Sequence, residues 1–272
     1  MSLTVLNSIS SLNAENALSS TQMSLQKTLT ELSTGLKINS GSDDAAGLAI
    51  ANGLGANISA LTQSSQNASD GVGLLQTADG ALSQVTTLLN RAVTLATEAS
   101  TGGLSTSQAT ALNTEYQSIL SEIGNIGSTT NFNGEAIFGT TASVYTSDGT
   151  SSGSATISTT IGALTTTALA LTGTNLTSTT GAQTALTDIT AAIATVAANR
   201  GSIGASVNQL TADQSVENTE VTNLTSAQNN IQNADVGQTV AQMTQYNVLE
   251  QTGMAALSQS NSAQQAVLKL LQ

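Results

Sequence analysis

The chain has 272 residues, enough for one or two ordinary domains, and contains no His, Cys, Trp or Pro. The commonest general base, the thiol nucleophile and the commonest metal ligands are therefore missing. A carboxylate enzyme remains possible, and no cofactor or metal site is predicted. A formal net charge of −12, with only five cations, disfavours nucleic acid and anionic membrane surfaces as partners.

The N-terminal segment predicts a helix with a single apolar stripe. Its first residues lack the basic start and apolar core of a cleaved signal peptide, and no apolar run approaches the roughly 18 residues of a membrane span. The stripe consists of Val5, Ile9, Leu12, Leu18, Leu25, Leu29, Leu32 and Leu36. Because nothing nearby could cover this stripe, the helix should be ordered only in company with other helices.

A second helical region follows a turn-rich break at residues 37–42. Asp43 and Asp44 can supply the cap and the dipole partner of a helix that runs to about residue 66. Two adjacent carboxylates could also bind a cation, but they are a weak metal signal and the cap is the preferred interpretation. The turn-like residues 69–71 predict a break before the next helix.

The next helix carries an apolar seam that alternates steps of three and four residues. This seam consists of Leu75, Ala78, Leu82, Val85, Leu89, Ala92, Ala96 and Ala99. Glycines at 102 and 103 end the helix, and Ser105 or Ser107 can cap a further one. A turn is predicted at residues 131–134.

Half of residues 139–184 are Ser or Thr, and Asp148 is their only charge. Helical periodicity disappears here, and such side chains compete for the backbone hydrogen bonds of a helix. Asp148 and Gly149 form a hairpin-turn signal between short strands at residues 143–147 and 155–160. Disorder of part of this stretch is a nearly equal alternative.

From residue 186 to residue 231 a seam residue recurs every three, then four, positions. The average step of about 3.5 is the period of a left-handed coiled coil. Burial of this seam alone does not offset the entropy of ordering so long a helix, so partner helices are required. The seam positions are Leu186, Ile189, Ile193, Val196, Arg200, Ile203, Val207, Leu210, Gln214, Glu217, Val221, Leu224, Gln228 and Ile231.

Arg200 occupies a seam position where an apolar residue is expected. Its side chain could extend its charged end to water. Alternatively, it forms a register-setting ion pair with a carboxylate on a facing helix, for which Glu115 and Glu122 are candidates.

The last segment carries a seam dominated by small residues, which permits close helix approach but leaves little area to bury within one chain. Both ends of the chain are therefore predicted to be incomplete surfaces that other copies cover. The predicted self-assembly residues are Val5, Ile9, Leu12, Leu25, Leu29, Leu32 and Leu36 at the N-terminal end, and Leu249, Ala256, Ala263, Val267 and Leu270 at the C-terminal end.

Several strings in this arrangement resemble bacterial flagellin. The first half contains LKINS at residues 36–40, DDAAGLAI at 43–50 and SDGVGLLQTADGAL at 69–82. The second half contains Arg200 followed by IGA, the triplet NAD, and VLKLL near the end. The resemblance covers roughly residues 1–138 and 185–272, and so many motifs in the right order are highly specific.

The resemblance implies a mainly α fold: a long antiparallel helical coiled-coil rod formed by the N- and C-terminal halves, with a small β-hairpin or loop region in the middle. Residues 1–42 would form an N-terminal inner-core helix with its connecting loop, and residues 233–272 the C-terminal inner-core helix. Residues 43–138 and 185–232 would form the rod core, and residues 139–184 the exposed Ser/Thr-rich hairpin region.

It also implies a structural subunit, not an enzyme, that polymerises with its own copies into the extracellular filament of the bacterial flagellum and serves swimming. The subunit would leave the cell unfolded through the flagellar export channel. An export chaperone on the C-terminal helix and the filament cap and junction proteins are implied partners. Arg91, Leu95 and Glu115 match positions that face an innate immune receptor, with weak recognition expected because Val93 and Thr94 depart from the family's pattern.

Two other functions share parts of this pattern. A hook–filament junction protein has the same terminal helices but would not polymerise in bulk. A secreted coiled-coil adhesin or translocator should have ordered ends as a single copy and should form no filament.

Overall fold

The structure of the chain, a computed structural model, describes residues 9–150 and 154–270. The helices of this part are α1 (Ile9–Thr34), α2 (Ala45–Ala99), α3 (Thr106–Thr129), α4 (Thr179–Gln232) and α5 (Val236–Leu270). Its strands are β1 (Asn131–Phe132), β2 (Glu135–Ala136), β3 (Thr140–Ser147) and β4 (Ser154–Ile161). None of the described helices is both long and apolar enough to cross a membrane.

The chain forms two compact units, which are described separately. A terminal unit contains Met1–Gly55 and Leu224–Gln272, and a central unit contains Ala56–Asn223. Helical secondary structure dominates both units, and the paired strands lie in the middle of the chain. The predicted mainly α fold with a small β-hairpin region is confirmed.

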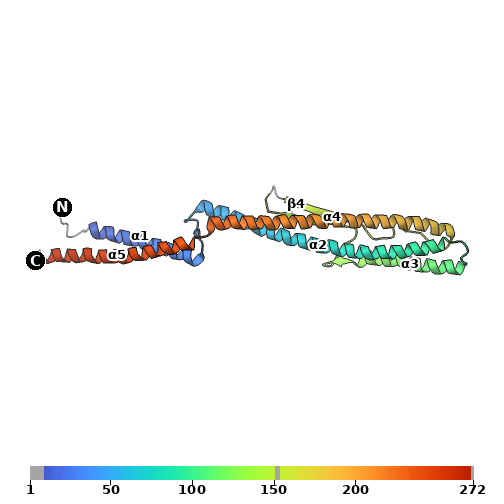
Figure 1. The fold of residues 1–272 in the computed structure, drawn as a ribbon, viewed down its shortest axis with the longest axis horizontal. Coiled ribbons are helices and arrows are strands. Elements are labelled where there is room, and N and C mark those ends of the chain that lie inside the picture. The colour runs from blue at the N-terminus through green and yellow to red at the C-terminus, as the bar shows by residue number, and fades with distance from the viewer. Residues whose placement is uncertain (1–8, 151–153, 271–272) are drawn as a thin grey trace. The chain divides into compact units, whose positions relative to one another are not determined.

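The core of the central unit lies where α2, α3 and α4 run side by side (Figure 1). The predicted α2 seam from Leu75 to Ala99 is buried at every position. From α4 the core receives Ile189, Val196, Ile203 and Leu210, and from α3 it receives Tyr116, Ile119, Leu120 and Ile123. Asp79 of α2 binds Arg200 of α4, and the earlier α2 residue Ser64 binds the later α4 residue Glu217. The helices α2 and α4 therefore run antiparallel, as the pairing of the two halves predicts.

The break predicted at residues 69–71 is wrong, because α2 continues through it without interruption. Gly71 lies inside the helix, where the hairpin approaches closely. A Cβ atom at this position would lie 2.4 Å from Cγ2 of Val144, a distance that real Cβ atoms do not reach. The glycine therefore permits packing of β3 against α2, although in the sequence it resembles a turn residue.

β3 and β4 form the predicted hairpin, paired antiparallel from Thr140 with Ile161 to Ser147 with Ser154. Burial alternates along the strands: Ala142 and Val144 pack against the core, whereas Thr141 and Ser143 are exposed. β1 and β2 form a smaller hairpin at the turn predicted for residues 131–134. The segment between β4 and α4 returns to the core through buried Leu164, Leu169, Leu171 and Leu176.

Gly127 of α3 is expected to be intolerant of substitution. A Cβ atom there would lie 2.6 Å from the backbone oxygen of Leu164, which a side-chain rotation cannot move away. Gly127→Ala should therefore lower the free energy of unfolding by about 1–3 kcal/mol. Gly124 of the same helix has no atom within 4 Å of its Cβ position, so Gly124→Ala should raise stability by about 0.5–1 kcal/mol. Urea unfolding of both variants measures these changes, and equal effects would contradict the expectation.

In the terminal unit, α1 and α5 pair antiparallel and lie side by side in Figure 1. The Nε2 of Gln22 donates to Oε1 of Glu250 at 3.2 Å, and the hydroxyls of Ser11 and Ser260 lie 2.9 Å apart. A β-bridge between Leu36 and Asn233 joins the residues that follow α1 to those that precede α5. The two ends of the chain are thereby held in one register.

Candidate functional site

The terminal unit exposes large apolar side chains on both of its paired helices. Nine of these side chains, between 41% and 73% exposed, form what we call the exposed apolar set: Ile9, Leu12, Met23, Leu29, Val236, Val240, Val248, Leu249 and Met254. Because each one is already partly covered, covering the rest of it would contribute roughly 1–2 kcal/mol. Apolar side chains that stay exposed on both members of a helix pair are a candidate contact surface.

The buried residues of α1 and α5 are, by contrast, small and polar. Thr28 and Thr239 are buried, and each donates its hydroxyl hydrogen to a helix carbonyl four residues earlier, at 2.9 and 2.8 Å. The buried apolar residues among the described part of the terminal unit are Ile38 and Ala51, which lie outside both helices. The two helices therefore bury little apolar area against each other and expose more.

The predicted self-assembly residues fall into three groups. Ile9, Leu12, Leu29, Leu249, Ala256 and Ala263 are exposed, and Leu25, Leu32 and Leu36 are half-buried. Val5 lies outside the described residues, and Val267 and Leu270 belong to α5 but their side chains are not described. The predicted self-assembly residues do not include five members of the exposed apolar set: Met23, Val236, Val240, Val248 and Met254.

Asp43 and Asp44 have different roles at the start of α2. Oδ1 of Asp44 accepts the backbone N–H of Gly47 at 2.9 Å, which is the contact of a helix cap. Asp43 instead closes the preceding loop: it accepts the backbone N–H groups of Asn39 and Ser40 and forms a 3.0 Å ion pair with Lys27. The hydrogen bond from Lys27, followed by the bond from the Ser40 hydroxyl, lowers the pKa of Asp43 to about 2.

Arg200 forms an ion pair between α4 and α2, but not with either predicted partner. Its Nε lies 2.7 Å from Oδ1 of Asp79 and its Nη2 lies 3.1 Å from Oδ2, so the contact is bidentate. The hydrogen bond from Arg200 lowers the pKa of Asp79. The expected pairing with Glu115 or Glu122 is corrected because the seam position of Arg200 faces α2, where Asp79 directly follows a seam residue.

The three residues matched to an immune receptor are not all available at the surface. Arg91 and Glu115 form an exposed ion pair of 2.7 Å between α2 and α3. Leu95 is only 1% exposed and packs in the core, so its expected receptor-facing role is corrected. The physical reason is that α3 packs beside the α2 seam and widens the buried face of α2 beyond the heptad positions.

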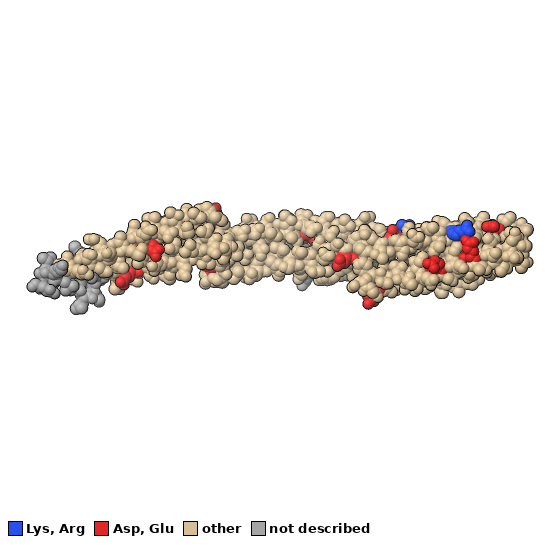
Figure 2. Space-filling view, turned by 90° about the horizontal axis from the view of Figure 1, so that it is seen from below, with Lys and Arg blue, Asp and Glu red and all other residues tan. Residues whose placement is uncertain are grey.

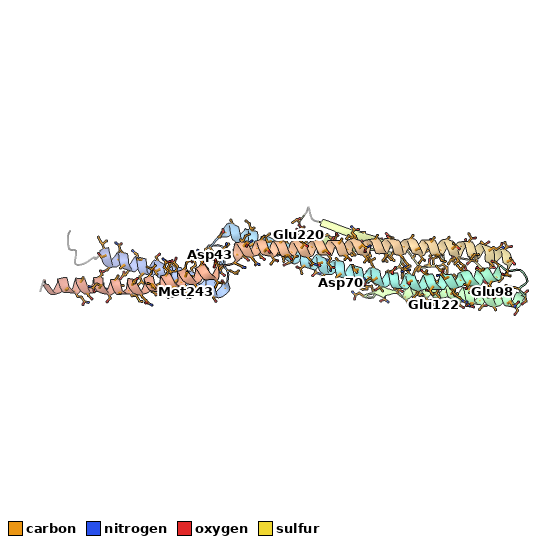
Figure 3. The ribbon with its side chains drawn as sticks, in the orientation of Figure 1. Asp43, Asp70, Glu98, Glu122, Glu220 and Met243 are labelled. Carbon is orange, nitrogen blue, oxygen red and sulfur yellow. The ribbon has the colours of Figure 1, made fainter. Side chains whose placement is uncertain are left out.

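Glu122, labelled in Figure 3, also lies on α3, and its carboxylate accepts a hydrogen bond from the side chain of Asn125.

Each cation whose side chain the structure describes has a partner within the chain. Lys27, Arg91 and Arg200 form ion pairs, and Nζ of Lys37 donates to the backbone oxygen of Asn230 at 3.1 Å. On the face shown in Figure 2 charged side chains are few, and most of the surface is uncharged. Among the described cations, Lys37 is therefore the one whose partner is a backbone oxygen and not a carboxylate.

Glu217 of α4 is a buried carboxyl group that the sequence analysis treated only as a seam position. It is 6% exposed, and its Oε1 accepts a hydrogen bond from the hydroxyl of Ser64. That hydroxyl oxygen accepts the backbone N–H of Ser147 at 2.9 Å, so the group connects α4, α2 and the hairpin. Oε2 of Glu217 has no hydrogen-bond partner among the described residues.

Burial raises the pKa of Glu217, and the nearby carboxylates of Asp213 and Glu220 act in the same direction. The carboxyl group is thus more costly to ionise in the folded chain than in water. A carboxylate inside an apolar seam was the signal in the sequence that could have identified this group.

The described residues offer no constellation for catalysis or metal binding. Among them no group of three or more acidic side chains lies close enough to hold a metal ion. A shallow groove of about 390 Å³ between α3 and the segment before α4 is lined by hydroxyl, amide and aliphatic groups, including Gln117, Ser121, Thr166 and Leu171. The feature with an evident physical consequence is the exposed apolar set.

Comparison with known proteins covers both halves of the chain. Residues 5–143 match the family described as the bacterial flagellin N-terminal helical region, and residues 186–271 match the bacterial flagellin C-terminal helical region. A flagellin of Halalkalibacterium halodurans is 34% identical over 250 residues, which are 90% of this chain and 91% of that protein.

Other relatives share only part of their length with the chain. A flagellin of Serratia marcescens is 47% identical over 124 residues, which are 46% of this chain and 35% of that longer protein. A crystal structure of Bacillus cereus flagellin is similar with a TM-score of 0.49 and 30% identity, over 56% of this chain and 88% of that one.

Proposed function

This chain belongs to the bacterial flagellin family, and on that premise we propose that the exposed apolar set of its terminal unit is the surface through which its copies polymerise. As a flagellin it is a structural protein and not an enzyme. Copies of this subunit form the extracellular flagellar filament. The observation that carries the proposal is a contrast between the two units: the central unit buries most of its large apolar side chains, whereas nine large apolar side chains of the paired terminal helices are exposed.

The physical argument is that a single copy leaves this surface in water. Two paired helices that bury threonines and expose Leu, Val, Ile and Met gain little free energy from each other. A neighbouring copy that covers the exposed apolar set supplies the missing burial, and this stabilises the helices only in the assembled state. We therefore assign residues 1–42 and 233–272 to polymerisation, and the central unit to the part that folds on its own core.

Amide hydrogen exchange tests this assignment. In the single copy, amides of α1 and α5 should exchange orders of magnitude faster than those of the buried α2 seam, because local opening costs less free energy where few apolar contacts form. In the filament, α1 and α5 should become strongly protected while the central core changes little. The central core serves as the internal control. If α1 and α5 were already fully protected in the single copy, the proposal would be wrong.

The same surface is our proposed contact for other partners. An export chaperone that covers the C-terminal helix α5 would keep the exposed Val248, Leu249 and Met254 from meeting other copies before export. Filament cap and junction proteins would contact the same helices at the ends of the filament.

Contact with an immune receptor would instead involve the central unit, and would be limited to the exposed Arg91 and Glu115, which already pair with each other.

A further inference from the structure

Methionine is the side chain of this chain that is most open to oxidation. The sequence has no Cys, His or Trp and only four Met. Two of the described methionines, Met23 at 65% and Met254 at 49%, are strongly exposed, and Met243 is half-buried. Both exposed methionines belong to the exposed apolar set.

The antiparallel register of α1 and α5 places each methionine near an apolar residue of the facing helix. Gln22 contacts Glu250, so the next residue of α1, Met23, lies at the level of Leu249. Met254 follows Gly253, the residue of α5 that lies against Leu18. Val248 and Leu249, which are also exposed, have no side-chain donor to offer a polar atom.

We propose that Met23 and Met254 are modification sites, which hydrogen peroxide converts to methionine sulfoxide in the free subunit, and that this modification prevents polymerisation. The inference rests on the proposed function of the exposed apolar set. In the reaction a lone pair of the thioether sulfur attacks one peroxide oxygen, the O–O bond breaks, and proton transfer to the departing oxygen yields water. The sulfur is oxidised by two electrons and the peroxide is reduced by two.

Oxidation to the sulfoxide makes the exposed apolar set more polar at positions that a neighbouring copy must cover. Its oxygen is a strong hydrogen-bond acceptor that is solvated in the free subunit. A neighbouring copy would remove that water, and this desolvation has a free-energy cost that the thioether does not have. In the assembled filament, polymerisation should in turn protect Met23 and Met254 from oxidation, because a covered sulfur is inaccessible to peroxide.

The test treats heat-dissociated subunits with hydrogen peroxide, removes the oxidant and adds filament seeds. Peptide mass spectrometry locates the sulfoxides, and sedimentation gives the subunit concentration that remains unpolymerised. We expect this concentration to rise about tenfold for each oxidised site. The double variant Met23→Leu/Met254→Leu keeps the side-chain volume and should polymerise equally well before and after peroxide.

Met243→Leu is the matched control, because Met243 lies on the same helix as Met254 (Figure 3) but is half-buried. This variant should lose polymerisation after peroxide as the unmodified sequence does. In intact filaments Met23 and Met254 should oxidise at least tenfold more slowly than in free subunits, in proportion to the lower exposure of the sulfur.

Three results separate the two proposals. If untreated subunits polymerise but oxidation at Met23 and Met254 has no effect, the methionine inference is wrong and the proposed function stands. Equal inhibition of the double variant and of the original sequence would also overturn the inference, because the sensitive site would then lie elsewhere. Failure of untreated subunits to polymerise on seeds would contradict the proposed function itself.

Discussion

Replacement of Leu29 and Leu249 by Asp is expected to abolish polymerisation while the central unit stays folded. Both side chains are nearly half exposed in the single copy, at 47% and 44%, so the single copy tolerates the charge in water. Assembly would have to remove that water from two new carboxylates, while Lys27, Arg91 and Arg200 already form ion pairs within the chain. A buried unpaired carboxylate costs several kcal/mol, and the apolar burial lost on assembly adds roughly 1 kcal/mol for each half-exposed side chain.

The two free-energy costs together predict a rise of more than about a thousandfold in the subunit concentration needed for seeded growth. Sedimentation and electron microscopy of seeded samples measure this concentration. Val216→Asp is the matched control, because Val216 is an apolar residue of the central unit that is 64% exposed. It adds the same charge outside the exposed apolar set and should leave growth nearly unchanged. Filaments of Leu29→Asp/Leu249→Asp at ordinary concentrations would rule out this surface as the contact between copies.

Glu217→Leu is expected to stabilise the central unit by about 1–4 kcal/mol at neutral pH, an effect opposite to that of most seam substitutions. The substitution removes a 6% exposed carboxyl group whose Oε2 has no partner among the described residues. It also leaves the hydrogen of the buried Ser64 hydroxyl without its acceptor, a cost that the gain from removing the carboxyl group must exceed, whereas the bond from the backbone N–H of Ser147 to this hydroxyl remains. The apolar side chain should fill the seam in place of a group that is costly to ionise.

The pH dependence of stability identifies the cause. Burial raises the pKa of Glu217 above its ordinary value of 4.5, so the folded chain holds this proton more tightly than the unfolded chain. The stabilising contribution of the proton is therefore complete below about pH 4.5 and is lost as pH rises through the raised pKa. The neighbouring carboxylates of Asp213 and Glu220 also raise the pKa of Glu217.

Urea unfolding at about pH 4.5 and about pH 8 should show that Glu217→Leu gains most at the higher pH. Glu217→Gln, which is neutral but keeps a hydrogen-bond acceptor, should remove the same pH dependence. Glu98→Gln is the control, because this exposed carboxylate lies on α2 of the same unit (Figure 3). A gain of equal size at both pH values would mean that packing, rather than ionisation of Glu217, explains the result.

Periodicity predicted the helices and seams because burial requires one side of a helix to be apolar. The eight α2 seam residues from Leu75 to Ala99 are all buried for this reason. The hairpin was also predictable, since Asp148 and Gly149 favour a turn between alternating segments.

Features that depend on which elements face each other were not predictable in the same way. A glycine needed for contact, such as Gly71, has the same signature as a glycine in a turn, so a continuous helix was divided in two. The period placed Arg200 in the seam but could not say that α2, rather than α3, lies opposite. The family resemblance implied that Leu95 faces a receptor, but α3 covers this side of α2 and Leu95 is buried.

The internal pairing of the cations has an electrostatic consequence at the scale of the whole fibre. With a formal net charge of −12, each subunit contributes an excess of negative charge that its own Lys and Arg do not balance. A stack of many subunits is then a linear polyanion surrounded by a cloud of counterions. At low ionic strength this cloud extends to about 30 Å, so separate fibres should repel one another and resist bundling until salt compresses it.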